Sequence, residues 1–147
     1  MRRIAIVALL PLIALIGCNR GGKAPSEVTG PSSPPGFEVR YNAVIALARR
    51  GSDKIKDERA WETLQEMLDE DQQLRNFKHE LPDKQKVSDP GAAHVTLITA
   101  LQAVAELHRR RPEMDLSDLK PAIEKLTQSR NLAVSTEAKR TQQLLTK

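Results

Sequence analysis

A segment rich in glycine, proline and serine divides this chain and limits where a hydrophobic core can form. It spans residues 19–36, reads NRGGKAPSEVTGPSSPPG, and has Val28 as its only large aliphatic residue. Such a composition cannot bury enough apolar surface to offset the entropy of ordering the backbone. The sequence therefore predicts one folded domain over residues 37–147, preceded by a flexible linker that acts as a spacer.

The composition favours helices as the elements of that domain. Hydrophobic residues make up 39% of the chain and charged residues 29%, which is ordinary for a soluble domain. Aromatic residues make up only 3%, so aliphatic side chains and alanine must fill the core, as they do between closely packed helices. We therefore predict an all-α fold of about five helices.

The first 18 residues have the layout of a secretory signal. The basic pair Arg2-Arg3 precedes an apolar run over residues 4–16, which is followed by Gly17 and Cys18. A helix that spans a bilayer needs roughly 20 apolar residues, so this run is too short for a retained span. The pattern predicts a signal peptide over residues 1–17.

The residues at the cleavage site, Leu15-Ile16-Gly17-Cys18, resemble the lipobox of bacterial lipoproteins. In that family the peptide bond after the glycine is cut and the cysteine thiol receives a diacylglycerol. The resemblance therefore implies cleavage between Gly17 and Cys18 and lipidation of Cys18, followed by a flexible Gly/Pro/Ser linker over residues 18–36. The covalent lipid on Cys18 would be the only attached group, since the residues indicate no other cofactor.

A lipid on the chain would decide where the protein is held. Each buried methylene contributes about 0.8 kcal/mol, so two or three acyl chains anchor a protein firmly. The resemblance implies a lipid-anchored protein at the cell membrane or outer membrane of a bacterium, with its domain periplasmic or at the surface. Two alternatives stay open: an ordinary signal peptide beside a free cysteine, and an uncleaved anchor.

Helical periodicity predicts the first two elements of the domain. A first helix spans Glu38–Arg50 and ends at Gly51, which suits a left-handed cap. Its predicted inward residues are Val39, Ala43, Ala46 and Leu47, flanked by Val44, Ile45 and Ala48. A second helix begins after the N-cap Asp57 and either stops at a turn near Asp69 or continues to Phe77. Its predicted inward residues are Trp61, Leu64, Met67 and Leu68.

Three further helices are predicted after a long loop at residues 78–88. Asp89-Pro90 is a strong start signal, because an N-cap residue is followed by proline at the first helical position. The helix that follows would bury Val95, Leu97, Ile98, Leu101, Val104, Ala105 and His108. Another helix begins near Ser117 with Leu119, Ile123 and Leu126 inward, and the last runs from about Asn131 to Leu145.

Several of these stretches resemble HEAT repeats, whose second helix commonly begins Val-Arg-x-x-Ala-x-x-Ala-Leu. Residues 39–47, VRYNAVIAL, match that pattern throughout, residues 134–138 repeat its Val-to-Ala spacing, and Ala100-Leu101 is a shorter match. Val39 and Val134 lie about two repeats of 40–47 residues apart. The resemblance implies a short HEAT/armadillo-like helical repeat over residues 37–147, and an irregular helical bundle is the alternative.

The residues indicate no catalytic or metal site. His94 and His108 lie about 21 Å apart on one predicted helix, and His79-Glu80 lacks the spacing that places two imidazoles on one helical face. No nucleophile elbow, phosphate loop or calcium loop is present. We therefore expect a protein that is not an enzyme, although a small hydrolase with a triad formed only in the fold stays open.

Four residues are candidates for a binding surface. Arg109, Arg110 and Arg111 could contact anionic groups, although cations also complement a helix C-terminus. Trp61 is the first aromatic residue to consider as a binding platform, although it also suits the core.

Removal of Arg2 and Arg3 lowers the formal charge from +4 to about +2, which gives no reason to expect nucleic acid.

Two binding functions are favoured over the small hydrolase. HEAT-like folds usually bind proteins along a helical face, so the first is an envelope lipoprotein that acts as a protein-protein interaction or scaffold module with an unknown partner. The second is a structural lipoprotein that binds cell-wall material or another anionic polymer through Arg109–Arg111, Lys78, Lys84 and Lys86. Binding to a polymer would weaken with salt.

Overall fold

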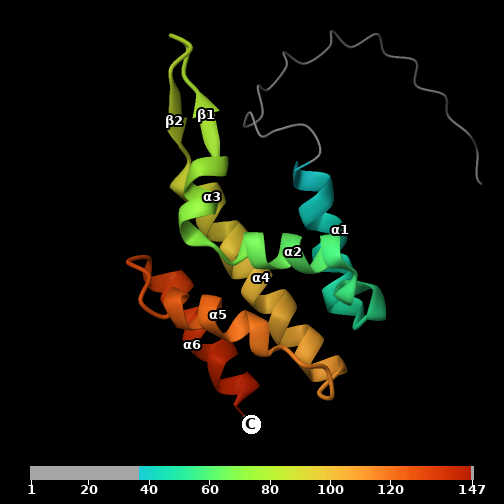
Figure 1. The fold of residues 1–147 in the computed structure, drawn as a ribbon. Coiled ribbons are helices and arrows are strands. Elements are labelled where there is room, and N and C mark those ends of the chain that lie inside the picture. The colour runs from blue at the N-terminus through green and yellow to red at the C-terminus, as the bar shows by residue number, and fades with distance from the viewer. Residues whose placement is uncertain (1–36, 147) are drawn as a thin grey trace, which may run out of the picture.

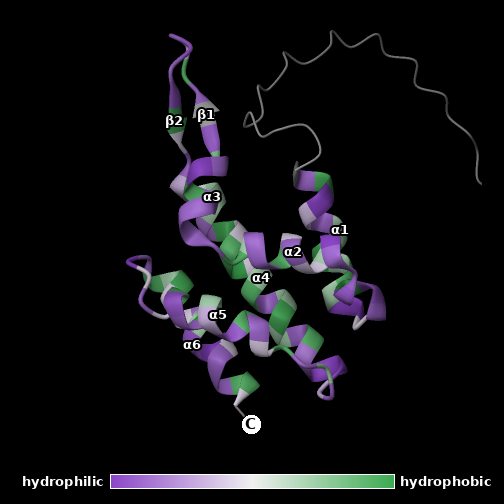
Figure 2. Ribbon diagram, viewed as in Figure 1, coloured by the Kyte–Doolittle hydropathy of each residue, from purple (hydrophilic) through white to green (hydrophobic). Residues whose placement is uncertain are grey.

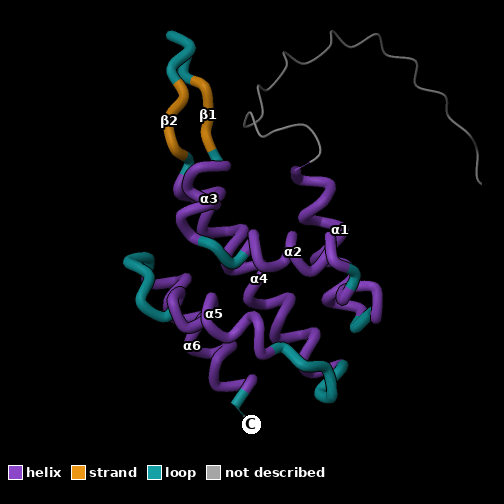
Figure 3. Tube along the Cα trace, in the orientation of Figure 1, coloured by secondary structure: helices purple, strands orange, loops and turns teal. Residues whose placement is uncertain are grey.

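Helices account for most of residues 37–146, the part of the chain that the computed structural model describes (Figure 1). The predicted all-α fold is confirmed, with one short hairpin added (Figure 3). The predicted signal peptide, Cys18 and the linker lie outside the described residues. The elements in chain order are α1 (Phe37–Arg50), η1 (Asp53–Lys56), α2 (Glu58–Met67), α3 (Glu70–Asn76), β1 (Lys78–Glu80), β2 (Lys86–Ser88), α4 (Pro90–Arg110), η2 (Ser117–Leu119), α5 (Lys120–Leu126) and α6 (Leu132–Leu145), where η1 and η2 are 3₁₀ helices.

Helix α4 lies at the centre of the fold. Helix α1 packs along one side of α4 and α6 along the other, so these three helices form one layer (Figure 1). The second layer contains α2, which packs on α1 and α4, α3, which packs on α4, and α5, which packs on α6. The core lies between the layers, and Figure 2 shows α4 as largely hydrophobic while the hairpin is largely hydrophilic.

The predicted helix boundaries follow from local capping chemistry. Gly51 has a φ of 65°, and the Ser52 N–H donates to the Leu47 carbonyl, which completes a Schellman cap on α1. The Asp89 side chain accepts from the Ala92 N–H at the start of α4. Asn131 caps α6 by accepting from the N–H groups of residues 133 and 134.

The prediction of the buried face of α1 is partly wrong, because only its flanking residues Val44 and Ala48 are buried. The core takes Tyr41, Val44 and Ala48 from this helix, whereas Val39 is 74% exposed and Ala43 and Ala46 also face solvent. Val39, Ala43 and Ala46 do share a face, as their spacing requires, but that face lies opposite the core. The Tyr41 hydroxyl can enter the interior because side chains of α2 and α3 bond to it.

The predicted second helix is divided in two, and this division gives six α-helices among residues 37–146. Three carboxylates follow Leu68, and they would oppose the dipole at a helix C-terminus. Instead Asp69 starts α3, where its side chain accepts a hydrogen bond from the Gln72 N–H. Of the predicted inward residues, Leu64, Met67 and Leu68 are buried and Trp61 is half-buried.

The predicted loop at residues 78–88 is an antiparallel hairpin in which Lys78 pairs with Ser88. The Lys84 N–H donates to the Leu81 carbonyl at 2.8 Å, and Lys84 has a φ of 65°. Pro82 occupies position i+1 of this turn, which suits proline because its ring fixes φ. The strands of three residues each are too short to show an alternating pattern in the sequence.

The predictions for the last three helices are mostly confirmed. Residues 97, 101, 104 and 105 of α4 are buried, Ile98 and His108 are half-buried, and Leu119, Ile123 and Leu126 are buried as predicted. Val95 is the exception, because 63% of it is exposed. It lines a depression together with residues from the N-terminal half of α1.

Candidate binding groove

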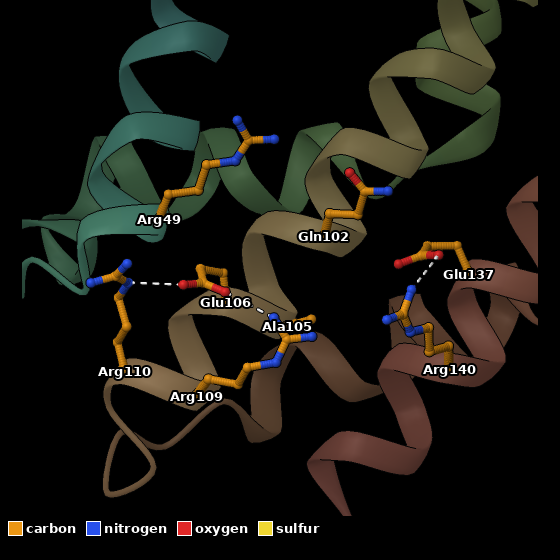
Figure 4. A pocket seen from close by; sticks show the side chains of 8 residues that line it. All are labelled: Arg49, Gln102, Ala105, Glu106, Arg109, Arg110, Glu137 and Arg140. Carbon is orange, nitrogen blue, oxygen red and sulfur yellow. Dashed lines mark hydrogen bonds and ion pairs between the residues drawn. The ribbon is translucent and has the colours of Figure 1, made fainter.

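A groove of about 420 Å³ lies on α4 between α1 and α6, and we call it the arginine groove. Figure 4 shows Arg49 and Arg140 on the two helices that flank α4. The lining residues are Arg49 from α1, Gln102, Ala105, Glu106, Arg109 and Arg110 from α4, and Glu137 and Arg140 from α6. Residues distant in the sequence therefore meet here because α1, α4 and α6 form one layer.

Apart from Arg49, the charged side chains of the arginine groove pair within their own helices. Glu106 accepts from Arg109 Nη1 at 2.8 Å and from Arg110 Nε at 3.0 Å, and these hydrogen bonds hold its pKa below the usual carboxyl range. Glu137 lies 3.8 Å from Arg140. The groove contains four guanidinium groups and two carboxylates, so positive charge is in excess.

Arg49 is the groove cation whose charge is least compensated. It is exposed at the last turn of α1, and it has no ion pair within residues 37–146. Its place in the last turn suits the helix dipole. The helix dipole does not neutralise the charge of a guanidinium group, so Arg49 can still bind an anionic ligand.

A smaller depression of about 230 Å³ lies further towards the N-terminal ends of α1 and α4, and we call it the Val95 depression. Its lining includes Tyr41, Ile45, Phe77 and Val95, with Thr99 on the side of the arginine groove. The residues at 95, 99, 102 and 106 follow helical spacing along α4. One open face of the layer therefore has an apolar end and a cationic end.

Only two of the four candidate binding residues lie in the arginine groove. Arg109 and Arg110 line it, but Arg111 is turned towards the 3₁₀ helix η1. Its Nη1 donates to Asp53 Oδ1 at 2.6 Å and to the Gly51 carbonyl at 3.2 Å, and its Nε donates to Glu113. The hydrogen bonds to Glu113 and Asp53 raise the pKa of Arg111, and its contacts connect the ends of α1 and α4.

Trp61 lies apart from the arginine groove. It is half-buried on α2 in the second layer, and Lys56 Nζ sits 3.8 Å from the centroid of its ring. The same ammonium group donates to the Asp115 carbonyl at 2.6 Å. The ring is thus covered by a cation that also joins η1 to the loop after α4.

The lysines proposed with these arginines for polymer binding also lie elsewhere. Lys78, Lys84 and Lys86 belong to the hairpin, which precedes the first residue of α4 and extends away from the helices (Figure 1). Arg109 and Arg110 are at the other end of α4, which is about 30 Å long. The structure therefore separates the two basic clusters.

Comparison of the chain with protein-family models, with curated proteins and with solved structures gives no match.

A polar cluster that was not predicted from the sequence lines a depression of about 730 Å³ and consists of Glu70, His94, Ser129 and Asn131. Ser129 Oγ donates to Glu70 Oε1 at 2.6 Å, and Asn131 Nδ2 donates to His94 Nδ1 at 2.9 Å. His94 Nε2 is 3.9 Å from Glu70 Oε1. The N-cap role of Asn131 is readable in the sequence, but the approach of Glu70 is not.

This cluster joins elements but does not form the pair that a serine hydrolase needs. Asn131 Oδ1 accepts two backbone N–H groups, so its amide nitrogen faces His94 and makes Nδ1 an acceptor. The Ser129 hydroxyl donates a hydrogen bond to the Glu70 carboxylate and accepts one from the Asn131 N–H, so it is not paired with the imidazole. The bonds instead fasten the loop after α5 to α3 and α4.

Two further properties of residues 37–146 bear on function. They contain no group of three or more His, Cys, Asp or Glu side chains placed to hold a metal ion. Within the same residues, no helix is both long and apolar enough to cross a membrane.

Proposed function

We propose that this protein is a lipid-anchored envelope lipoprotein whose helical domain binds another protein through the open face of the α1–α4–α6 layer. One observation carries the binding part of the proposal. Within residues 37–146, the ion pairs of the arginine groove all form inside one helix and Arg49 has none, so these charges do not hold one helix to another. A surface built in this way keeps polar groups available to a partner.

The arrangement of the helices supports the resemblance to a helical repeat. The three segments that carry the HEAT-like residues lie in α1, α4 and α6, and these helices are neighbours in one layer. The N-terminal parts of α1 and α4 line the Val95 depression and their C-terminal parts line the arginine groove, so these two helices run in the same direction. Stacked helical repeats use such continuous surfaces to bind partners.

The anchor rests on residues 15–18 and has its own test. We expect the wild type to partition into membranes and its N-terminal fragment to carry the mass of a lipid at Cys18. The Cys18→Ala variant should lose both. Equal partitioning of the two variants, with an unmodified Cys18, would contradict the anchor without affecting the groove.

A photo-crosslinking experiment tests the groove. A photoreactive amino acid is placed at Gln102, in the arginine groove, and separately at Glu62, an exposed residue of α2 in the second layer. We expect one protein partner to crosslink in the native envelope from position 102 and not from position 62. The same crosslinks from both positions, or none from position 102, would refute the proposed binding face.

Binding of an anionic polymer is the second candidate, because positive charge is in excess in the arginine groove. The hairpin lysines are too distant to extend this cluster directly. Salt separates the candidates, since binding to a polymer through charge alone falls steeply as ionic strength rises. If a protein still crosslinks from position 102 when the irradiation is done in 0.5 M salt, that result would count against the polymer.

A further inference from the structure

The arginine groove has the donors to bind carboxylates. A guanidinium group binds a carboxylate with two parallel hydrogen bonds, and these charge-assisted bonds are stronger than neutral ones. Arg49 and Arg140 reach the groove from opposite sides of α4, so one ligand can contact both (Figure 4). The two resident carboxylates, Glu106 and Glu137, compensate only part of the charge.

The Val95 depression adds a second requirement on the ligand. The rise of an α-helix places Val95 and Glu106 about 16 Å apart along α4. A helical ligand segment of about 11 residues, or an extended segment of about five, covers that length. Val95 is 63% exposed, so an apolar side chain of the ligand would remove apolar surface from water at this end.

The position of the acidic residues favours a protein segment over an anionic polymer. Glu106 and Glu137 stand among the arginines, where a closely spaced chain of phosphates would meet repulsion from both. A polymer also gains nothing from the apolar depression. A protein can place its carboxylates beside the arginines alone.

We infer that the partner docks an acidic protein segment along α4, with its carboxylates in the arginine groove and an apolar side chain in the Val95 depression. This inference rests on the proposed function and names the chemistry of the partner. It also assigns Arg49 and Arg140 as the anchoring cations. Helix-in-groove binding of this kind combines apolar anchors with charge complementarity.

Fluorescence anisotropy with synthetic peptides tests the inference on the full chain. The probes are labelled peptides of 14 residues that carry one leucine and three glutamates, with the spacing between them varied. A matched set has glutamine in place of glutamate. We expect at least one glutamate peptide to bind about tenfold or more tightly than its glutamine counterpart, as expected for charge-assisted hydrogen bonds.

Matched variants locate the binding site. We expect Arg49→Gln/Arg140→Gln to weaken the best peptide about tenfold or more. The control Arg50→Gln/Lys139→Gln removes the same charge from neighbouring exposed positions that do not line the groove, and it should change affinity less than about twofold. All these side chains are exposed, and unchanged melting temperatures would show that each variant is folded.

The apolar end has its own matched pair. Val95 and Val39 are both largely exposed, but only Val95 lines a depression that adjoins the groove. We expect Val95→Ser to weaken the best peptide about threefold or more and Val39→Ser to leave it unchanged. Equal effects of the two substitutions would overturn the apolar part of the inference.

Other outcomes overturn the acidic segment as the ligand. Equal losses in the two double variants would show attraction by net charge alone. A different ligand would be indicated if no glutamate peptide bound more tightly than its glutamine counterpart. In that case polyphosphate, or vesicles that contain anionic phospholipid, would bind the wild type and lose affinity in Arg49→Gln/Arg140→Gln but not in Arg50→Gln/Lys139→Gln. That result would assign the groove to a polymer or a membrane. A crosslink from position 102 without any preference for glutamate would leave the proposed function standing and refute only this inference.

Discussion

Two glutamates on opposite sides of the helical layer have similar exposure but different roles. The Glu66 side chain is 25% exposed and that of Glu106 is 31% exposed, and each bonds to arginine. The donors to Glu66 come from α1 and α3, namely Arg40, Tyr41 and Asn76, whereas both donors to Glu106 come from α4 itself. Burial therefore does not distinguish a structural carboxylate from an available one, but the origin of its donors does.

The partners of Glu66 extend into the core. The side chains of Tyr41, Glu66 and Gln73, with Arg40 and Asn76, form what we call the Tyr41 network. Gln73 is fully buried, and its Nε2 donates to Tyr41 Oη at 2.9 Å and to the Glu66 carbonyl at 2.7 Å. Among residues 37–146 its Oε1 finds no hydrogen-bond partner, so this network already holds one costly buried polar atom. Further losses there should be expensive.

A substitution at Gly51 should reduce stability most. This residue allows α1 to lie close to α4, and both the Glu66 and the Glu106 regions depend on that packing. A Cβ at this residue would lie 2.9 Å from Arg110 Cβ, and the φ of 65° disfavours any side chain. We expect Gly51→Ala to lower the free energy of unfolding by about 2–4 kcal/mol, measured by urea denaturation. Gly91→Ala is the control, since Gly91 does not require a left-handed backbone. Equal losses would contradict this role of Gly51.

Glu66→Ala should come next. It leaves the Tyr41 hydroxyl without a carboxylate acceptor and removes the ion pair with Arg40, at a cost of about 2 kcal/mol in the free energy of unfolding. The control Glu62→Ala lies on the same helix and is exposed. If both substitutions changed the urea midpoint equally, the Tyr41 network would not hold α1 to α2.

Alkaline pH should weaken the same region more gradually. Burial raises the pKa of Tyr41, and the negative charge of Glu66 acts in the same direction. The unfolded chain releases this proton near pH 10 while the folded chain keeps it, so stability is lost as pH rises above about 10. The loss approaches about 1.4 kcal/mol per pH unit.

The single tyrosine makes this titration directly measurable. Tyr41 is the only tyrosine in the chain, so tyrosinate absorbance reports on it alone. We expect no tyrosinate signal from the folded protein at pH 10.5 and a strong signal after denaturation. Tyr41→Phe should remove the additional alkaline decline in stability. A tyrosinate signal at the same pH in both states would show that the side chain is not protected.

Glu106→Gln should have the smallest effect on stability. Its partners Arg109 and Arg110 lie on the same helix, so the substitution breaks no link between elements. We expect an unchanged melting temperature in calorimetry and tighter binding of the glutamate peptides, because two guanidinium groups are released. A clear fall in melting temperature would mean that the groove is part of the scaffold, and weaker binding would argue against carboxylate ligands.

The sequence predicted the helices well where a few neighbouring residues decide the structure. Asp89-Pro90 and Asn131 start helices because their side chains bond to backbone N–H groups three or fewer residues away. The turn at Asp69 was one of two alternatives that the sequence allowed. The hairpin was missed because its strands are short and polar.

The candidate site was only partly predictable. Arg109 and Arg110 were identified from their charge, but Arg49 and Arg140 come from other helices, and no local pattern connects them with α4. Arg111 was predicted to act with its neighbours. It turns away because Asp53 and the Gly51 carbonyl, which are far away in the sequence, lie beside it in the fold.

The sequence by itself determined where α1 ends and where α4 and α6 begin, since capping acts over a few residues. Only the tertiary structure decided which face of α1 is buried. Both faces carry apolar residues, and burial of Tyr41 is favourable only because Glu66 and Gln73 arrive from α2 and α3 to bond its hydroxyl. The same assembly leaves Val39 in solvent and places Arg49 beside the arginines of α4.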